Sequence, residues 1–135
     1  MTKTERAYIA AARAVSELSD HKQKIGCVVV NKHRIISSGA NSSTKCHKVQ
    51  AELDKARFGI DSPGKIHAET ACLLPLIKNG VNLSDATIFV YRELKDGTPA
   101  MARPCPSCEK LIRSCGIKRM YYSVNGAIAY EKIIY

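Results

Sequence analysis

The sequence predicts a three-layer α/β/α domain in which three helices cover a five-stranded mixed sheet. Segments with the 3.6-residue periodicity of amphipathic helices alternate along the chain with short apolar runs rich in β-branched residues. No repeat, low-complexity tract or linker interrupts the 135 residues, a length that suits one hydrophobic core. We therefore expect residues 1–135 to form a single domain.

The first three predicted elements are a helix and a hairpin. Residues 25–30 are continuously apolar, as expected of a strand buried on both faces, and residues 31–33 form a turn to a second strand over 34–39. Residues 4–18 have the spacing of an amphipathic helix with the charged residues off its apolar face. The expected apolar face consists of Ala7, Ala10, Ala11, Ala14, Val15 and Leu18.

The middle of the chain contains a long connection and a second helix. Residues 40–66 are polar and basic, with a candidate short helix from Val49 to Arg57. A connection of this length in a small domain is more often functional than idle. Helical spacing returns over 67–78, although Pro75 is expected to loosen the last turns.

The last third of the chain predicts a strand over 86–91, a helix over 104–115 and a strand over 117–123. Pro104 suits the first turn of a helix, where the missing N–H costs nothing. An Asn-Gly turn follows the strand, so the final strand over 127–131 is expected to return antiparallel to its neighbour.

The composition restricts the class of protein. Lysine and arginine number 21 against 12 aspartates and glutamates, and the net charge of +9 favours an anionic substrate or partner. With 45% hydrophobic and 24% charged residues the chain is not of the disordered class. No signal-peptide segment and no run approaching about 20 apolar residues occurs. We therefore expect a cytoplasmic protein without a membrane partner, whose six cysteines are reduced thiols.

Two short motifs carry the chemistry, each at the start of a predicted helix. Cys105 and Cys108 are three residues apart on one helical face and can hold one ion, and His67 on another helix can supply a third ligand. Three protein ligands leave the fourth zinc position for water, which is the catalytic pattern. Glu69, two residues after the histidine, is placed to take a proton from that water and deliver it to a leaving group.

The remaining cysteines and histidines have simpler interpretations. A structural zinc completed by Cys46 or His47 would leave Glu69 unexplained, as would a zinc-stabilised nucleic-acid-binding module without catalysis. A second metal at Cys46 and His47 stays open, beside the interpretation that they are surface loop residues. Core thiols packed among apolar side chains are predicted at Cys27, Cys72 and Cys115. Histidines in solvated turns are predicted at His21 and His33.

The H-x-E and P-C-x-x-C motifs, which begin at His67 and Pro104, resemble those of the zinc-dependent cytidine and deoxycytidylate deaminases. The order of helices and strands resembles that family over nearly the whole chain. The resemblance implies a cytidine deaminase-like fold and a zinc cofactor, with Glu69 as the proton shuttle. The zinc ligands it implies are His67, Cys105 and Cys108.

The same resemblance implies substrate contacts and an assembly. It places the side chain of Asn41 against the sugar of the substrate and the backbone of Ala68 beside the base. Members of the family usually form dimers, tetramers or hexamers, so a homo-oligomer is expected. The implied reaction is hydrolytic removal of an exocyclic amine, with cytosine or adenine left open.

Positive charge near the motifs favours a phosphorylated substrate. Arg103, next to the second motif, is the first candidate for a phosphate contact. A polynucleotide deaminase needs stacking platforms, and the chain has two Phe, six Tyr and no Trp, so a small-molecule nucleotide is favoured, with dCMP to dUMP as the expected reaction. The loops before the two motifs contain Lys45, Lys48, Lys55, Arg57 and Lys65, and Arg92, Lys95 and Arg103.

The alternative substrate is a base within single-stranded DNA or tRNA. The long loop lacks the Gly-Tyr-Asn-Gly stretch that deoxycytidylate deaminases often show, and the loop over 92–103 is longer than usual. The expected hairpin at the end of the chain also differs from the helix and parallel strand usual in those enzymes. A nucleic-acid partner therefore stays open.

Overall fold

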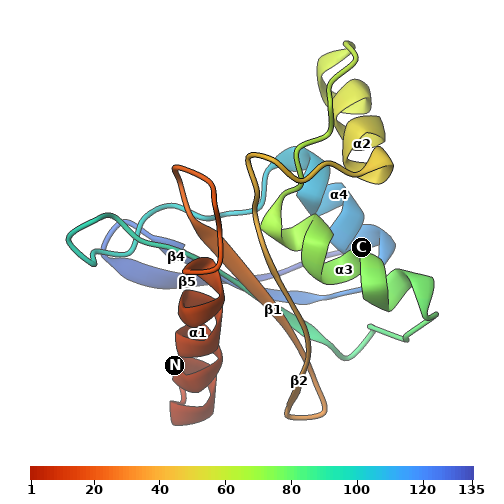
Figure 1. Ribbon diagram of the computed structural model, residues 1–135. Helices are drawn as coiled ribbons and strands as arrows, with labels where there is room; N and C mark the ends of the chain where they lie inside the picture. Colours follow the sequence, from red (N-terminus) through yellow and green to blue (C-terminus); the bar gives the residue numbers. More distant parts are fainter.

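A computed structural model describes all 135 residues and contains a five-stranded sheet with the strand order β2-β1-β3-β4-β5 (Figure 1). The strands are preceded, connected and covered by four helices. In chain order the elements are α1 (Lys3–Ser16), β1 (Ile25–Asn31), β2 (Arg34–Ala40), α2 (Lys48–Phe58), α3 (Ala68–Lys78), β3 (Thr87–Arg92), α4 (Pro106–Ser114), β4 (Arg119–Val124) and β5 (Ala127–Lys132).

The sheet is mixed, as the sequence predicts. Strand β1 pairs antiparallel with β2 and β3, and β3 pairs parallel with β4 through the crossover helix α4. Strand β5 returns antiparallel to β4, which confirms the expected direction of the last strand. The parallel pair matters for the site, because the single segment that follows β3 and leads into α4 starts from one end of the sheet.

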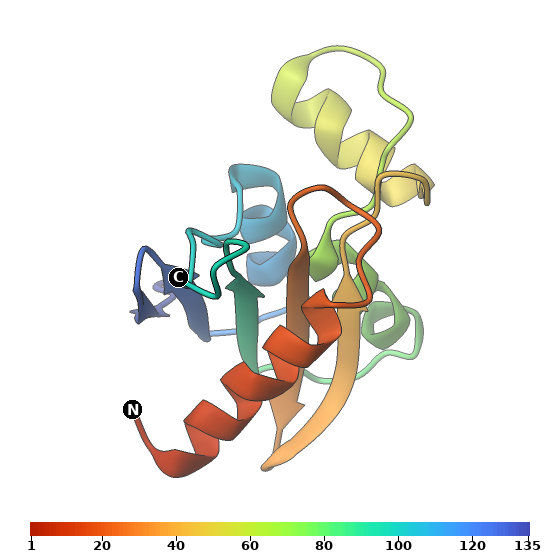
Figure 2. The same cartoon turned by 60° about the vertical axis from the view of Figure 1, so that its left-hand side comes forward.

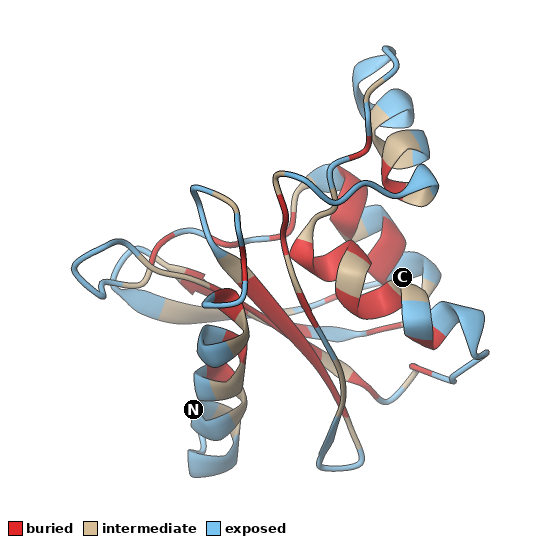
Figure 3. Ribbon diagram, in the orientation of Figure 1, coloured by how far each residue is buried: buried red, intermediate tan, exposed pale blue.

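Helices cover both faces of the sheet (Figures 1 and 2). Helix α1 packs on one face over a small cluster that includes Ile9, Val28 and Phe89, and α3 and α4 pack on the other over the main core. The central strands are almost entirely buried (Figure 3). The predicted three-layer α/β/α arrangement is therefore confirmed, with the short helix expected near 49–57 present as α2.

Two glycines let the helices approach the sheet closely. A Cβ on Gly26 of β1 would lie 2.1 Å from the Ala12 carbonyl oxygen of α1, and one on Gly39 of β2 would lie 2.5 Å from the Cys72 nitrogen of α3. Both separations are far below van der Waals contact, so a side chain at either position would displace a helix. Because α3 begins directly after His67, the close contact at Gly39 also sets the distance between the sheet and the first motif.

The structure corrects the predicted face and end of the first helix. The buried residues of α1 are Ile9, Ala12 and Ser16, whereas Leu18 lies beyond the helix and is 79% exposed. Alanine occurs on both sides of this helix and is compatible with burial or exposure, so periodicity alone does not choose the face. The buried face of α1 is determined by its contact with Gly26, because Ala12 and Ser16 are small enough to pack against the strand backbone.

Other element boundaries differ by one to two residues from those expected. Helix α3 continues through Pro75 to Lys78, and α4 begins at Pro106 with Cys105 as its N-cap. No helix combines the length and the hydrophobicity needed to cross a membrane.

Candidate metal centre and active-site cavity

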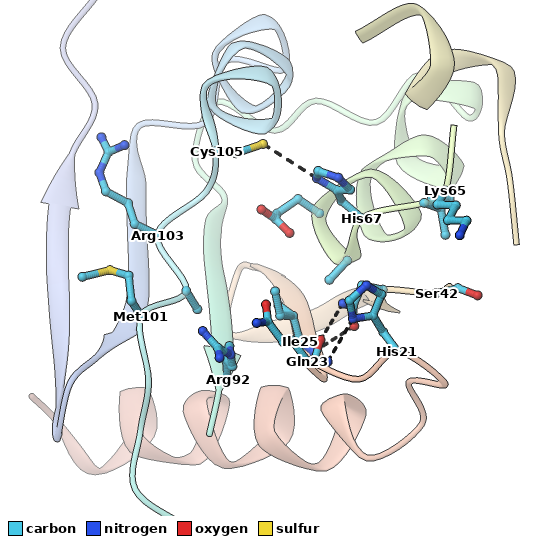
Figure 4. A pocket seen from close by; sticks show the side chains of 15 residues that line it. His21, Gln23, Ile25, Ser42, Lys65, His67, Arg92, Met101, Arg103 and Cys105 are labelled. Atoms are coloured by element: carbon cyan, nitrogen blue, oxygen red, sulfur yellow. Dashed lines mark hydrogen bonds between the residues drawn. The ribbon is translucent and has the colours of Figure 1, made fainter. Parts of the chain in front are cut away.

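The two sequence motifs meet where the N-termini of α3 and α4 converge. His67 is the N-cap residue of α3, Cys105 is the N-cap residue of α4, and Cys108 lies in the first turn of α4. The His67 Nδ1 atom is 3.3 Å from the Cys108 sulfur and 3.7 Å from the Cys105 sulfur. Figure 4 shows Cys105 and His67 pointing toward one another at one side of a cavity.

These distances fit a tetrahedral zinc ion. Zinc–sulfur bonds of about 2.3 Å and zinc–nitrogen bonds of about 2.0 Å at tetrahedral angles put nitrogen and sulfur about 3.5 Å apart. All three ligand atoms lie within 4.8 Å of one another, so a single ion can touch each of them. A set of two thiolates and one imidazole is typical of zinc.

Hydrogen bonds within this cluster already favour a thiolate. The pKa of Cys105 is lowered to about 3, chiefly by a hydrogen bond from the Cys108 thiol and further by His67. The hydrogen bond with Cys105 in turn raises the pKa of the His67 ring. The pKa of Cys108 is raised, because its proton is donated to Cys105 and its sulfur is buried. The positive ends of the two helices add to the preference for negative charge.

Glu69 lies in the first turn of α3 and lines the same cavity as His67. Its side chain is only 5% exposed, and burial raises the pKa of its carboxyl group. A carboxyl group with a raised pKa exchanges protons more readily near neutral pH. The structure thus places a buried carboxyl group in the same cavity as His67 and Cys105.

The cavity has a volume of about 290 Å³, comparable with the lower end of small-molecule sites. Its walls come from four segments: the loop from α1 into β1, the residues just after β2, the residues that lead into α3 with its first turn, and the segment from the end of β3 to Cys105 (Figure 4). Asn41 and Ala68, the expected substrate contacts, both line it.

Most of the hydrogen-bonding capacity of the Asn41 side chain is used by groups of the protein itself. Its Oδ1 atom accepts hydrogen bonds from the Ser19 hydroxyl and the Ile25 N–H, and its Nδ2 atom donates to the Gln23 carbonyl oxygen. Its second Nδ2–H makes no hydrogen bond within the protein, since the amide has two and one is used. A further hydrogen bond, from the Ser43 N–H to the Asp20 carboxylate at 2.8 Å, also joins the loop after α1 to the residues after β2.

Comparison with known proteins agrees with this site. Residues 1–124 match the family model described as the cytidine and deoxycytidylate deaminase zinc-binding region. The chain belongs to the cytidine and deoxycytidylate deaminase family. It is 30% identical over 127 residues to a deoxycytidylate deaminase of Mycobacterium phage D29, covering 85% of this chain and 90% of that protein.

Two solved structures extend the family comparison. A dCMP deaminase of the cyanophage S-TIM5, crystallised with dCMP and dUMP, is 26% identical and superposes with a TM-score of 0.64 over 90% of this chain and 82% of its own. A cytidine deaminase of Burkholderia pseudomallei shares the fold with a TM-score of 0.65 and 20% identity, over 98% of this chain and 93% of its own. This deaminase family is zinc-dependent, and its metal-binding region includes all three clustered residues.

Most of the cationic residues expected around the deaminase site lie elsewhere. Of the eight lysines and arginines in the two loops, Lys65, Arg92 and Arg103 line the cavity. Helix α2 carries several of the others and extends away from the sheet (Figure 2), where Lys55 pairs with Asp61 at 3.2 Å. The positive charge of the long connection is therefore mainly a property of α2.

Arg103 already has two protein partners. Its guanidinium contacts Glu131 at 2.7 Å and Glu109 at 3.4 Å, and these carboxylates raise its pKa further. Arg92 has no such ion pair and lies below the centre of the cavity in Figure 4. The guanidinium of Arg103 is turned toward the edge of the view.

Sequence reasoning missed part of this deaminase cavity. His21 was expected to be a solvated turn residue, but it is half-buried, lines the cavity and accepts a hydrogen bond from the Gln23 N–H at 2.9 Å. Its position depends on Asn41, which holds the loop from 22 residues away through Ser19. The nearby sequence contains no signal for that contact.

The other residues singled out are placed as follows. Cys27 and Cys72 are fully buried, which confirms them as core thiols, and Cys115 is half-buried at the end of α4. Cys46 and His47 are exposed, and neither belongs to a cluster of three metal-ligating side chains. The structure therefore favours the surface-loop interpretation for that pair.

Proposed function

We propose that this protein hydrolyses dCMP to dUMP and ammonia. The observation that carries the proposal is the cluster of His67, Cys105 and Cys108 with Glu69 in one cavity of a deaminase-family chain. The relative from Mycobacterium phage D29 and the cyanophage structure are both named as deaminases of this nucleotide, which supports it as the substrate.

Each site residue has a proposed role. His67, Cys105 and Cys108 hold zinc, and zinc bound in this way lowers the pKa of water toward 7. Glu69 takes a proton from the attacking water and gives it to the exocyclic nitrogen as that nitrogen leaves. The carbon–nitrogen bond at the amino-bearing ring carbon breaks and a carbon–oxygen bond replaces it.

The substrate is oriented by groups that line the cavity. We propose that the free Nδ2–H of Asn41 contacts the sugar and that the backbone of Ala68 contacts the edge of the base. Lys65, Arg92 and Arg103 are the cations available to the 5′-phosphate. Because Arg103 is bound to two carboxylates, Arg92 has more capacity for a new anion than Arg103.

The experiment that tests the proposal is ammonia release from cytidine, deoxycytidine, CMP, dCMP, dCTP, single-stranded DNA and tRNA by the zinc-loaded protein. The expected result is the highest kcat/KM with dCMP. Preference for a nucleoside or for a polynucleotide would overturn dCMP as the substrate, and the second result would establish the nucleic-acid alternative.

Two matched variants test the phosphate contact. Arg92→Ala and Arg103→Ala are each assayed with dCMP and with deoxycytidine, which differ only in the phosphate. A contact raises KM for dCMP by about tenfold, equivalent to about 1.4 kcal/mol, and leaves KM for deoxycytidine unchanged. Equal effects on both substrates would exclude a phosphate contact at that residue.

We further propose that the protein acts in the cytoplasm as a homo-oligomer. Thiolate ligation requires reduced cysteines, and all six cysteines of the chain are free. Light scattering of the zinc-loaded protein measures the assembly, and a monomer at micromolar concentration would contradict it.

A further inference from the structure

Gln50 is the one fully buried residue of α2, a helix whose other side chains are polar, exposed or half-buried. Its relative exposure is 0%. A buried amide destabilises a protein unless its oxygen and nitrogen find partners. The partners of Gln50 therefore explain why a glutamine occupies this position.

The amide oxygen of Gln50 binds the start of α3. It accepts hydrogen bonds from the His67 N–H at 3.2 Å and from the Thr70 hydroxyl at 2.6 Å. The first turn of any helix has N–H groups without intrahelical partners, and the His67 side chain provides no cap here. Gln50, from another helix, supplies an acceptor for one such group, the N–H of the N-cap residue His67 itself.

The amide nitrogen of Gln50 is held in turn. It donates to Asp54 Oδ1 at 3.1 Å, and Asp54 Oδ2 accepts from the Ser62 hydroxyl at 2.7 Å. Ser62 also accepts from the Gly64 N–H at 3.0 Å, in the segment that leads into His67. The amide therefore has one orientation, with its oxygen directed at α3.

Close packing supports the same connection. A Cβ on Gly64 would lie 2.6 Å from both the Ala51 nitrogen and the His47 carbonyl oxygen, so α2 and this segment touch through their backbones. The network thus holds His67 directly through its backbone N–H and the first turn of α3 through Thr70.

We infer that Gln50 is a positioning residue of the metal centre, which holds His67 and the first turn of α3 at the distance that zinc binding requires. The inference rests on the proposed function in so far as that function needs the zinc centre. Without the amide oxygen, the His67 N–H and the Thr70 hydroxyl are buried without an acceptor. Because ligand positions are tolerated within about 0.2 Å, a small shift of His67 weakens the metal site.

The test uses Gln50→Met, which keeps the length and the volume of the side chain and removes the acceptor. The zinc dissociation constant is measured by competition with a chromogenic chelator, and the stability of the metal-free protein by urea unfolding. We expect the dissociation constant to rise about tenfold or more, in the range found when groups that orient metal ligands are removed. A change of less than twofold would overturn the inference.

A matched control separates positioning from general destabilisation. Leu53→Ala, also on α2, removes packing against the main core and leaves every hydrogen bond to His67 in place. It is expected to lower the urea midpoint while raising the dissociation constant less than twofold. An equal loss of zinc affinity in both variants would show that Gln50 acts only through stability, which contradicts the inference.

A second variant covers the case in which Gln50→Met does not fold. Asp54→Ala removes both acceptor oxygens, so the Gln50 amide nitrogen and the Ser62 hydroxyl both lose their partner. A rise of more than twofold in the zinc dissociation constant is expected, and an unchanged value would overturn the inference. Since the readout is zinc affinity, inactivity on dCMP would refute the proposed function alone.

Discussion

Replacing Glu69 with glutamine tests the catalytic step most directly. Glutamine has the same shape but neither takes nor gives a proton at neutral pH. Glu69 is the only carboxylate among the residues that line the cavity, so no neighbouring acid can substitute for it. We expect Glu69→Gln to bind zinc and substrate and to lose turnover.

The magnitude follows from the two transfers assigned to this one group. General acid–base catalysis contributes about 10²- to 10⁴-fold, and Glu69 serves both the attack of water and the departure of the amine. A loss in kcat of about 10³-fold or more is therefore expected, equivalent to about 4 kcal/mol of transition-state stabilisation. KM should change much less, because the proton transfers occur in the transition state.

The assay is ammonia release at saturating dCMP, with zinc content measured on the same preparation. Zinc should remain at about one ion per chain, and the urea midpoint should not fall, because the exchange removes a buried carboxyl whose charged form is disfavoured. A variant with normal zinc content and kcat within tenfold of the original would refute the proton-shuttle role of Glu69.

Three further predictions concern the metal, the packing beneath it and the loop beside it. Cys105→Ser should bring the zinc content from about one per chain toward zero, and retention of zinc in elemental analysis would contradict the ligand set. Gly39→Ala should lower both the unfolding free energy, by about 1–3 kcal/mol, and the zinc affinity, because its Cβ would lie 2.5 Å from the Cys72 nitrogen; Ser38→Ala on the same strand is the control, and equal zinc affinity in both would refute the coupling. Asp20 has a pKa lowered to about 2 by hydrogen bonds from Thr44, Ser43 and Ser42, so its stabilisation is present above its unfolded pKa of about 3.9 and lost as the pH falls toward 2. The difference in urea midpoint between the metal-free original and Asp20→Asn should accordingly shrink between pH 5 and pH 2, and a constant difference would contradict it.

The sheet was predictable because its signals are local. Runs such as Val28-Val29-Val30 are β-branched and apolar at every position, and the structure buries them on both faces. The Asn125-Gly126 turn likewise determines the antiparallel direction of β5 from two neighbouring residues. The metal cluster was predictable for a similar reason, since each motif starts a helix.

The features that sequence did not predict depend on contacts between distant residues. The face of α1 is chosen by Gly26, which lies ten residues after the helix ends, and His21 reaches the cavity through Asn41. The ion pairs of Arg103 involve Glu131, which is 28 residues away on the last strand. The motif alone identifies Arg103 as a cation near the site, but it does not show that Arg103 is paired with carboxylates.

The separation of the metal ligands along the chain has a consequence for survival of the protein in the cell. His67 and Cys105 are 38 residues apart, and a zinc ion that joins them closes a loop of that length. Because the unfolded chain lacks this preformed site, zinc binds the folded protein in preference and stabilises it by its binding free energy. Zinc thus acts as a removable cross-link, and a cell short of zinc would lose the folded protein to proteolysis as well as its activity. The abundance of this enzyme would then follow the zinc supply.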